Sequence, residues 1–462
     1  MNVSANSGIL ARSTGADLLG QAAALQAGRT SAAEAMAQAL AAADGAACRH
    51  AYVRRFDAMA VAAAEAVDRS LAAGAPLPPL AGLAVSVKDL FDVAGQPSTA
   101  ASKSLADAPP ATRDCPAVAR LRAAGAALTG HTNLTEFAFS GVGINPHHGT
   151  PANAATARLD VTPRIPGGST SGGAVTVAAG AAWAALGSDT RGSIRVPAAL
   201  HGLVGFKNTQ ALTPTEGCLP LSFTLDTACA ITRSVRDAVL LHEVLAARRV
   251  VLAGRPVQAL RLALPAGPLL DGLDATVARA FERSLRTLRD AGARIEELRL
   301  PNSDTPSTSS GQISGAEAWA WHRGRLESRA GDYDPRVLSR IRTGSGVSAA
   351  DYIDRLQSRR RWAAEVQAAV AGFDALICPT VPMVAPPLAP LLADDEAFFA
   401  TNALLLRNPS VVNHLDGCAI SLPCHTPDEL PVGLMLWGPA FSDDRVLDAA
   451  LAVEHALAGA GR

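Results

Sequence analysis

The chain has 462 residues, of which 48% are hydrophobic and 18% are charged, a balance typical of a globular protein and not of a disordered one. Its 41 basic and 42 acidic residues give a formal net charge of −1 without a basic tract, so nucleic acid, which requires a concentrated positive surface, is not an expected partner. The N-terminal sequence lacks the segments of a secretory signal, and no run of about 18 apolar residues is present to span a membrane.

The first 75 residues are rich in leucine and alanine at helical spacing, which predicts a helical N-terminal layer over 1–75. Thr30 or Ser31 is placed to cap the helix that follows it. Residues 83–95 predict a buried strand, and helix-like and strand-like segments alternate beyond it. This alternation is typical of an α/β fold in which helices cover a sheet.

The C-terminal half continues the alternation after an interruption. The polar stretch 301–312 predicts a loop, and residues 314–370 predict charged helices that form a peripheral layer or cap. Residues 373–390 predict a strand that ends in a proline-rich loop. Because no repeat or linker divides the chain, we expect a single domain over 1–462, with its catalytic core at 76–240.

The seven cysteines are scattered along the chain without a CxxC pair. Thiolate zinc sites usually show paired spacing, so no zinc site is expected, and unpaired cysteines fit the reducing cytoplasm. His147 and His148 are adjacent, but neighbouring residues rarely bind one metal ion. We therefore expect no metal, no cofactor and a cytoplasmic location.

Two clusters of glycine and serine lie close together, GGSTSGG at 167–173 and SDTRGS at 188–193. Ser193 follows a turn-forming run whose backbone N–H groups could converge on one point, as an oxyanion hole requires. A serine nucleophile also needs a base, yet neither a GxSxG elbow nor a suitable histidine motif is present. GGSTSGG lacks the Gly-Lys-Ser/Thr ending of a P-loop, which argues against phosphate binding.

Lys88 is the other available base, because it lies in the apolar segment VSVKDLF. Burial disfavours the ammonium form and lowers the pKa of a lysine, which could leave a neutral amine near pH 7. The residues leave open the alternative that Lys88 pairs with Asp89 or Asp92 and only closes the end of a strand.

The motifs PGGSTSGGA, ALGSDTRGSIRVPAAL and GLVGFKNT together resemble the amidase signature family of serine hydrolases. The resemblance extends to VSVKDLFDVAG, to GHTNLTEFAFSGVGINPHHGTPANA and to FDALICPTVPMVAPP, and it covers nearly the whole chain from about residue 15 onward. It implies a large mixed β-sheet covered by helices on both faces. It also implies a cofactor-independent hydrolase that cleaves carboxamide C–N bonds through an acyl-enzyme, a chemistry that also serves carbamates and esters.

Catalysis in that family uses a Ser–cis-Ser–Lys triad. The resemblance maps the nucleophile onto Ser193, the bridging serine onto Ser169 and the base onto Lys88, with the peptide bond between Gly168 and Ser169 held cis. Four consecutive backbone N–H groups would form the oxyanion hole, those of Thr190, Arg191, Gly192 and Ser193.

Other residues near these motifs receive supporting roles. Asp189 and Arg195 are expected to form a structural pair that fixes the nucleophile loop. Four consecutive residues are expected to border the substrate pocket, Ala138, Phe139, Ser140 and Gly141.

Arg191 departs from the family pattern, which commonly has Gly-Gly-Ser where this chain has Arg-Gly-Ser. We expect its guanidinium to point outward into solvent, because a buried and unpaired arginine is costly. If it points into the pocket instead, it would favour substrates with a carboxylate or a polar carbonyl.

Two other functions remain open. The chain could be the amidase subunit of a tRNA-dependent amidotransferase, which would need partner chains and an ammonia tunnel. It could also be a catalytically silent binding or scaffold protein, although Lys88, Ser169 and Ser193 are all present. As partners we expect a small-molecule amide or carbamate substrate and, at most, a second copy of the chain, so that the protein is a monomer or homodimer.

Overall fold

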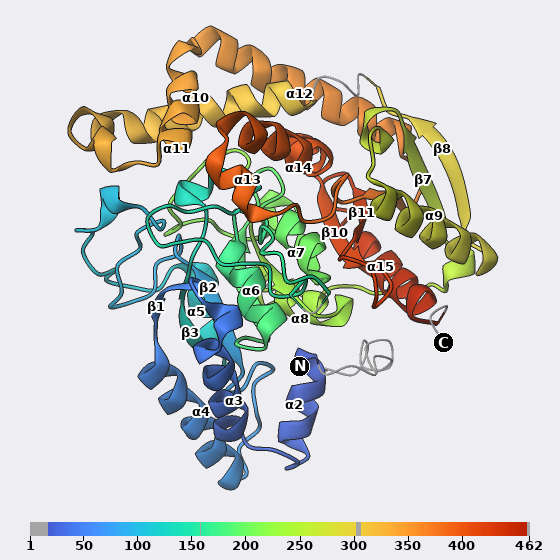
Figure 1. The fold of residues 1–462 in the computed structure, drawn as a ribbon. Helices are drawn as coiled ribbons and strands as arrows, with labels where there is room; N and C mark the ends of the chain where they lie inside the picture. Colours follow the sequence, from blue (N-terminus) through green and yellow to red (C-terminus); the bar gives the residue numbers. More distant parts are fainter. Residues whose placement is uncertain (1–16, 158, 302–305, 460–462) are drawn as a thin grey trace.

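The structure is a computed structural model that describes residues 17–157, 159–301 and 306–459 (Figure 1). The strands are β1 (Tyr52–Arg55), β2 (Ala84–Lys88), β3 (Ala127–Thr132), β4 (Ala184–Ser188), β5 (Val204–Lys207), β6 (Ala228–Thr232), β7 (Arg261–Ala266), β8 (Arg294–Arg299), β9 (Ala375–Pro379), β10 (Cys418–Pro423) and β11 (Gly433–Gly438). The α-helices are α2 (Leu18–Gln26), α3 (Ala32–Asp44), α4 (Asp57–Ala72), α5 (Pro116–Ala123), α6 (Ser171–Ala179), α7 (Arg195–His201), α8 (Val235–Ala246), α9 (Ala275–Asp290), α10 (Pro306–Arg329), α11 (Pro335–Thr343), α12 (Ala349–Ala369), α13 (Leu388–Ala393), α14 (Asp395–Leu415) and α15 (Asp443–Gly459).

The strands of the described residues form one mixed sheet in the order β1-β3-β2-β4-β6-β5-β10-β11-β9-β7-β8. β2 runs parallel to both β3 and β4, and β7 runs parallel to both β8 and β9. The strands between these two parallel groups pair antiparallel. The large mixed sheet and the α/β class expected from the sequence are confirmed.

Helices pack on both faces of this sheet, as the alternation of side chains along its strands shows. In β7, Leu262 and Leu264 join the apolar cluster of α9 and α15, whereas Ala263 joins the cluster of α12 and α14. In β9, Ile377 and Leu376 divide between the same two clusters. A strand that is buried on both faces has no polar side, which is why these segments read as continuous apolar runs.

The N-terminal layer is helical apart from one strand. Ser31 caps α3 in a capping box, because its Oγ accepts from the Glu34 amide and the Glu34 carboxylate accepts from the Ser31 amide, each at 3.0 Å. The expectation of helices alone over 1–75 is wrong at β1, which pairs antiparallel with β3 at the edge of the sheet. The first 16 residues of that range lie outside the described part of the chain.

The loop expected at 301–312 is helical from Pro306 onward, where α10 begins. Proline is favoured in the first turn of a helix, where its missing N–H is not needed. Ser309 and Ser310 are buried, and Ser310 Oγ lies 3.1 Å from a ring nitrogen of His414 on α14. Contacts with another helix therefore stabilise a segment whose composition alone indicates a loop.

The charged helical layer expected at 314–370 is present as α10, α11 and α12, which lie together along one side of the molecule (Figure 1). α10 packs against α11, α12 and α14, and this packing brings the layer next to the loops that leave the sheet. None of the helices in the described residues is both long enough and apolar enough to cross a membrane.

Candidate active site

The parallel strands β2 and β4 are neighbours in the sheet, and both end at the candidate active site. Lys88 is the last residue of β2 and Ser188 is the last residue of β4. Because parallel strands place their carboxyl ends at the same edge of a sheet, these two side chains meet there. Lys88 Nζ lies 2.9 Å from Ser188 Oγ and 2.8 Å from Ser169 Oγ. The structure therefore brings together the lysine and the bridging serine expected from the sequence.

Ser169 and Ser193 stand on two loops that a backbone hydrogen bond joins. The peptide bond between Gly168 and Ser169 is cis, as the family resemblance implies, and it leads directly into α6. The amide of Thr170 donates to the carbonyl of Ser193 at 3.2 Å. The loop of the bridging serine is thereby held against the loop of the candidate nucleophile.

The surroundings of Lys88 make its neutral form more accessible than that of a lysine in water. The side chain is fully buried, and its removal from water lowers the pKa of the amine to about 8 from an ordinary 10.5. The neighbouring carboxylates have other partners, since Asp89 accepts from the amide of Thr99 and Asp92 accepts from Ser98 Oγ. The alternative in which Lys88 pairs with one of these aspartates is therefore wrong.

Asp189 and Arg195 form the buried ion pair that the sequence predicts. Arg195 Nε and Nη2 donate to the two carboxylate oxygens at 3.0 Å and 2.9 Å. Burial by itself would raise the pKa of Asp189, but the charge and hydrogen bonds of Arg195 hold it well below its ordinary value. Asn413 of α14 donates to Asp189 and accepts from Arg195, so this helix helps to fix the nucleophile loop.

The amide of Gly192 has a different role from the one expected. It donates to Asp189 Oδ1 at 2.8 Å, so it is directed at the buried carboxylate and not at the pocket. The expectation that it donates to an oxyanion is wrong, because the loop winds around Asp189. A glycine is still required here, since φ is +126° and an added Cβ would lie 2.6 Å from Pro409 Cβ.

The candidate nucleophile faces a small pocket whose lining comes from several parts of the chain. The lining residues are Ala138, Phe139, Ser140, Thr190, Arg191, Ser193, Leu221, Ser314, Arg340 and Leu406. The space among them, about 310 Å³ with the part open to solvent, is narrow, and about 20 Å³ of it admits the centre of a water-sized sphere. Three of the four residues expected at the substrate pocket, Ala138, Phe139 and Ser140, are among these lining residues. Gly141 is not among them, because the backbone turns there toward α14 and its amide donates to Asn402 Oδ1 at 2.8 Å.

Arg191 faces the pocket, and the expectation that it points outward is wrong. Its side chain lines the same space as Ser193, and its Nε donates to Ser410 Oγ on α14 at 3.1 Å. Its removal from water lowers the pKa of the guanidinium to about 10, so the group stays charged at neutral pH. Helices α10 and α14 cover the nucleophile loop, and this cover turns the side chain inward.

Some residues of the site were not identified from the sequence. Ser188 accepts a hydrogen bond from Lys88, and its place at the end of a strand within the serine-rich motif was the available signal. Ser314, Arg340 and Leu406 belong to helices far along the chain, and no local motif marks them. Only the packing of α10, α11 and α14 over the loops brings them to Ser193.

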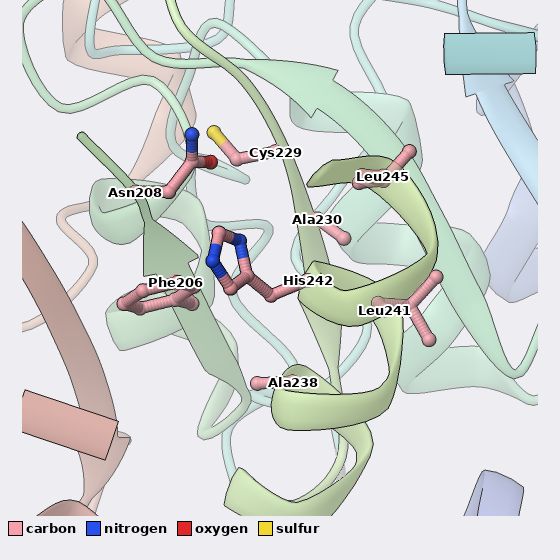
Figure 2. A pocket seen from close by; sticks show the side chains of 8 residues that line it. All are labelled: Phe206, Asn208, Cys229, Ala230, Ala238, Leu241, His242 and Leu245. Atoms are coloured by element: carbon pink, nitrogen blue, oxygen red, sulfur yellow. The ribbon is translucent and has the colours of Figure 1, made fainter. Parts of the chain in front are cut away.

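A second cavity, between α8 and the strands β5 and β6, holds a cysteine and a histidine that do not form a reactive pair. Figure 2 shows the imidazole of His242 beside Phe206, with Cys229 close by. Burial raises the pKa of the Cys229 thiol far above its ordinary value, so no thiolate forms. Burial and the charge of Arg248 lower the pKa of His242 to about 3, and its neutral ring lies 3.0 Å from Arg248 Nη2. These groups pack the interior.

Both the sequence and the fold of this chain are similar to those of known amidases. Residues 34–447, which include the whole candidate site, match the family model described as Amidase. The 2-amino-5-chloromuconic acid deaminase of Comamonas testosteroni is 36% identical over 89% of this chain and 90% of that protein. A glutamyl-tRNA(Gln) amidotransferase subunit from Salinispora tropica is 33% identical over 88% of this chain and 90% of that protein. A crystal structure described as an amidase superposes with a TM-score of 0.85, at 34% identity, over 95% of this chain and 99% of that one.

Proposed function

This chain belongs to the amidase family and is a hydrolase of amide C–N bonds, and from this we propose that it acts through an acyl-enzyme formed on Ser193. The observation that carries the proposal is the contact of the buried Lys88 Nζ with Ser169 Oγ at 2.8 Å, beside the loop that holds Ser193. A serine hydroxyl is a weak nucleophile that needs a nearby base, and a lysine with a lowered pKa can serve as one.

In the proposed reaction, the neutral amine of Lys88 accepts the proton of Ser169 as Ser169 accepts the proton of Ser193. Ser193 Oγ attacks the carbonyl carbon of the amide, and the C–N bond then breaks. The same relay returns the proton to the leaving nitrogen, so that ammonia or an amine departs. Water attacks the resulting ester by the same route and releases the carboxylic acid, which leaves Lys88 neutral again.

The oxyanion is proposed to bind to the amides of Thr190, Arg191 and Ser193, three residues that line the pocket. The amide of Gly192 holds Asp189 and thereby fixes the curvature of the loop. Donors that are held in place before the reaction stabilise the developing charge without reorganisation. The ion pair of Asp189 and Arg195 contributes to this, because it fixes the loop that carries the donor amides.

We expect kcat/KM for a neutral substrate to rise with pH and to level off above about pH 8. The base must be the neutral amine, and the pKa of Lys88 is about 8, so each pH unit below this value lowers the active fraction about tenfold. A profile measured from pH 6 to pH 10 by ammonia release checks this. A rate that is constant from pH 6 to pH 8 would contradict the assignment of Lys88 as the base.

Prolonged treatment with EDTA is expected to leave the activity unchanged. The proposed nucleophile and base are side chains of the chain itself, and among the described residues no three His, Cys, Asp or Glu side chains gather in a way that could hold a metal ion. Activity is compared before and after treatment and after addition of Zn²⁺ or Mn²⁺. Loss with EDTA followed by recovery with either metal would contradict the cofactor-independent mechanism.

Hydrolysis of carbamates and esters belongs to the same proposal, because both present a carbonyl carbon to Ser193. Measuring kcat/KM for a panel of small amides, carbamates and esters ranks the three substrate classes.

The role of an amidotransferase subunit stays an alternative function, favoured by the similarity to the Salinispora tropica protein. Hydrolysis of free glutamine that depends on a copurified partner would support it.

The cellular setting is also a proposal. We propose that the chain acts in the cytoplasm as a monomer or homodimer on a small molecule. The state of the cysteines supports a reducing compartment, since all seven are free thiols.

A further inference from the structure

Two arginines from distant parts of the chain line the pocket that holds Ser193. Arg191 belongs to the nucleophile loop, and Arg340 belongs to α11 in the helical layer. Both residues line the same narrow pocket as Ser193. A small substrate whose amide lies at Ser193 therefore has its remaining groups close to these two arginines.

Resting on the amidase function proposed above, we propose that the substrate is a small amide that also carries a carboxylate. Arg340 and Arg191 bind this carboxylate while Ser193 attacks the amide carbon. Monoamides of short dicarboxylic acids are the simplest compounds of this class.

The first support comes from the partners of Arg340. Its Nη1 donates to the carbonyl of Phe139 at 2.8 Å, and its guanidinium lies over the Phe139 ring, 5.4 Å from the ring centre. Arg336, one turn earlier on α11, pairs with Asp395, whereas no carboxylate of the described residues forms an ion pair with Arg340. A guanidinium that is partly withdrawn from water and has no carboxylate partner gains from an added anion.

The second support is the mutual effect of the two cations. Removal from water and the charge of Arg191 lower the pKa of Arg340 to about 10, and both groups remain protonated at neutral pH. Two positive charges at one small pocket repel each other, and a carboxylate between them removes that repulsion. Guanidinium and carboxylate are both planar and form paired, charge-assisted hydrogen bonds.

The rest of the lining defines the body of the substrate. It contains no aspartate or glutamate, so it offers no partner to a cationic group. The side chains of Ala138, Leu221 and Leu406 are apolar, and those of Ser140 and Ser314 are small. This surface suits a short carbon chain between the amide and the carboxylate.

The test compares succinamic acid with butyramide, which replaces the anionic end by a methyl group. The wild-type protein is expected to have the higher kcat/KM for succinamic acid, measured by ammonia release. Arg340→Met is expected to lower the ratio of the two kcat/KM values by about 10- to 150-fold, the range for a hydrogen bond to a charged group. Arg340→Lys, which keeps the charge, is expected to retain part of the preference. The control is Arg342→Met, because Arg342 lies on the same helix and is exposed.

A second readout does not depend on turnover. Succinate is expected to slow the labelling of Ser193 by a fluorophosphonate in the wild-type protein, whereas neutral butane-1,4-diol, which has no bond that the enzyme could hydrolyse, is not. Arg340→Met is expected to abolish this protection. A wild-type preference for butyramide, an unchanged ratio in Arg340→Met, or labelling of Ser193 that succinate does not slow would each overturn the carboxylate assignment and leave the proposed function standing. Absence of labelling at Ser193 would overturn the proposed function, and the carboxylate assignment with it.

Discussion

Replacing Ser193 by alanine is expected to lower kcat/KM by about 10⁴-fold or more, equivalent to about 5.5 kcal/mol of lost transition-state stabilisation. Without the hydroxyl no acyl-enzyme forms, and only binding and the oxyanion donors remain to assist attack by water. The loss in kcat/KM should be the same for amides with and without a carboxylate, because in both classes Ser193 Oγ would form its bond with the carbonyl carbon of the amide. Steady-state kinetics with ammonia release measure this effect.

The matched control for this substitution is Ser171→Ala. Ser171 stands in the other glycine and serine cluster, at the start of α6, where its Oγ donates to the carbonyl of Asn133 at 3.4 Å. We expect less than a tenfold change in kcat/KM for the control. Circular dichroism and thermal melting should show that both variants remain folded. A Ser193→Ala protein with more than a hundredth of the wild-type kcat/KM would show that another residue is the nucleophile.

The second large effect is expected at the base, where Lys88→Arg should lower kcat/KM nearly as much as the loss of Ser193. The guanidinium stays protonated, so it cannot accept a proton from Ser169, although it can still donate a hydrogen bond. Lys88→Ala should be similarly inactive, because it removes the base. When residues act as one unit, the losses of activity from their single substitutions do not add. The double variant Lys88→Ala/Ser193→Ala is therefore expected to be little worse than either single variant.

The kinetics of Lys88→Arg also separate a catalytic role from a structural one. Lys103→Arg makes the same chemical change at an exposed position and should leave kcat/KM unchanged. If Lys88 only fills the interior, Lys88→Arg should reduce thermal stability while the folded fraction keeps its activity. Wild-type activity in Lys88→Arg would overturn the proposed relay.

Much of the fold could be predicted because long segments carry a clear period. The alternation of strand-like and helix-like segments expected beyond residue 95 is present, for example, at β7 and α9, where Asp274 caps the helix by accepting from the Val277 amide at 2.8 Å. β1 was missed because it is a four-residue edge strand with two arginines, and its pairing with β3 is what makes it a strand. The start of α10 was missed because serine and threonine favour loops unless tertiary contacts bury them.

The features of the candidate site also fall into those that could be predicted from the sequence and those that could not. Lys88 and the cis bond before Ser169 followed from the motifs and the family resemblance, and the pair of Asp189 and Arg195 followed from residues within one loop. The direction of the Gly192 amide could not be predicted from the sequence, because it depends on how the loop winds around the carboxylate of Asp189.

The orientation of Arg191 was unpredictable for another reason. Burial of its side chain depends on α10 and α14, which lie more than a hundred positions further along the chain. Arg340 reaches the pocket only through the packing of α11, so no local pattern could connect it with Ser193. Specificity residues supplied by a separate layer of helices become visible only in the folded chain.

The central claim, that Ser193 forms the covalent intermediate, is tested most directly by mapping the site of reaction with a fluorophosphonate. The wild-type protein is incubated with the reagent, digested and analysed by tandem mass spectrometry. We predict a single adduct on Ser193, formed faster as the pH rises toward 8 and absent from the Ser193→Ala protein. An adduct on Ser169 or on any other serine, or an adduct of unchanged yield in Ser193→Ala, would contradict this claim.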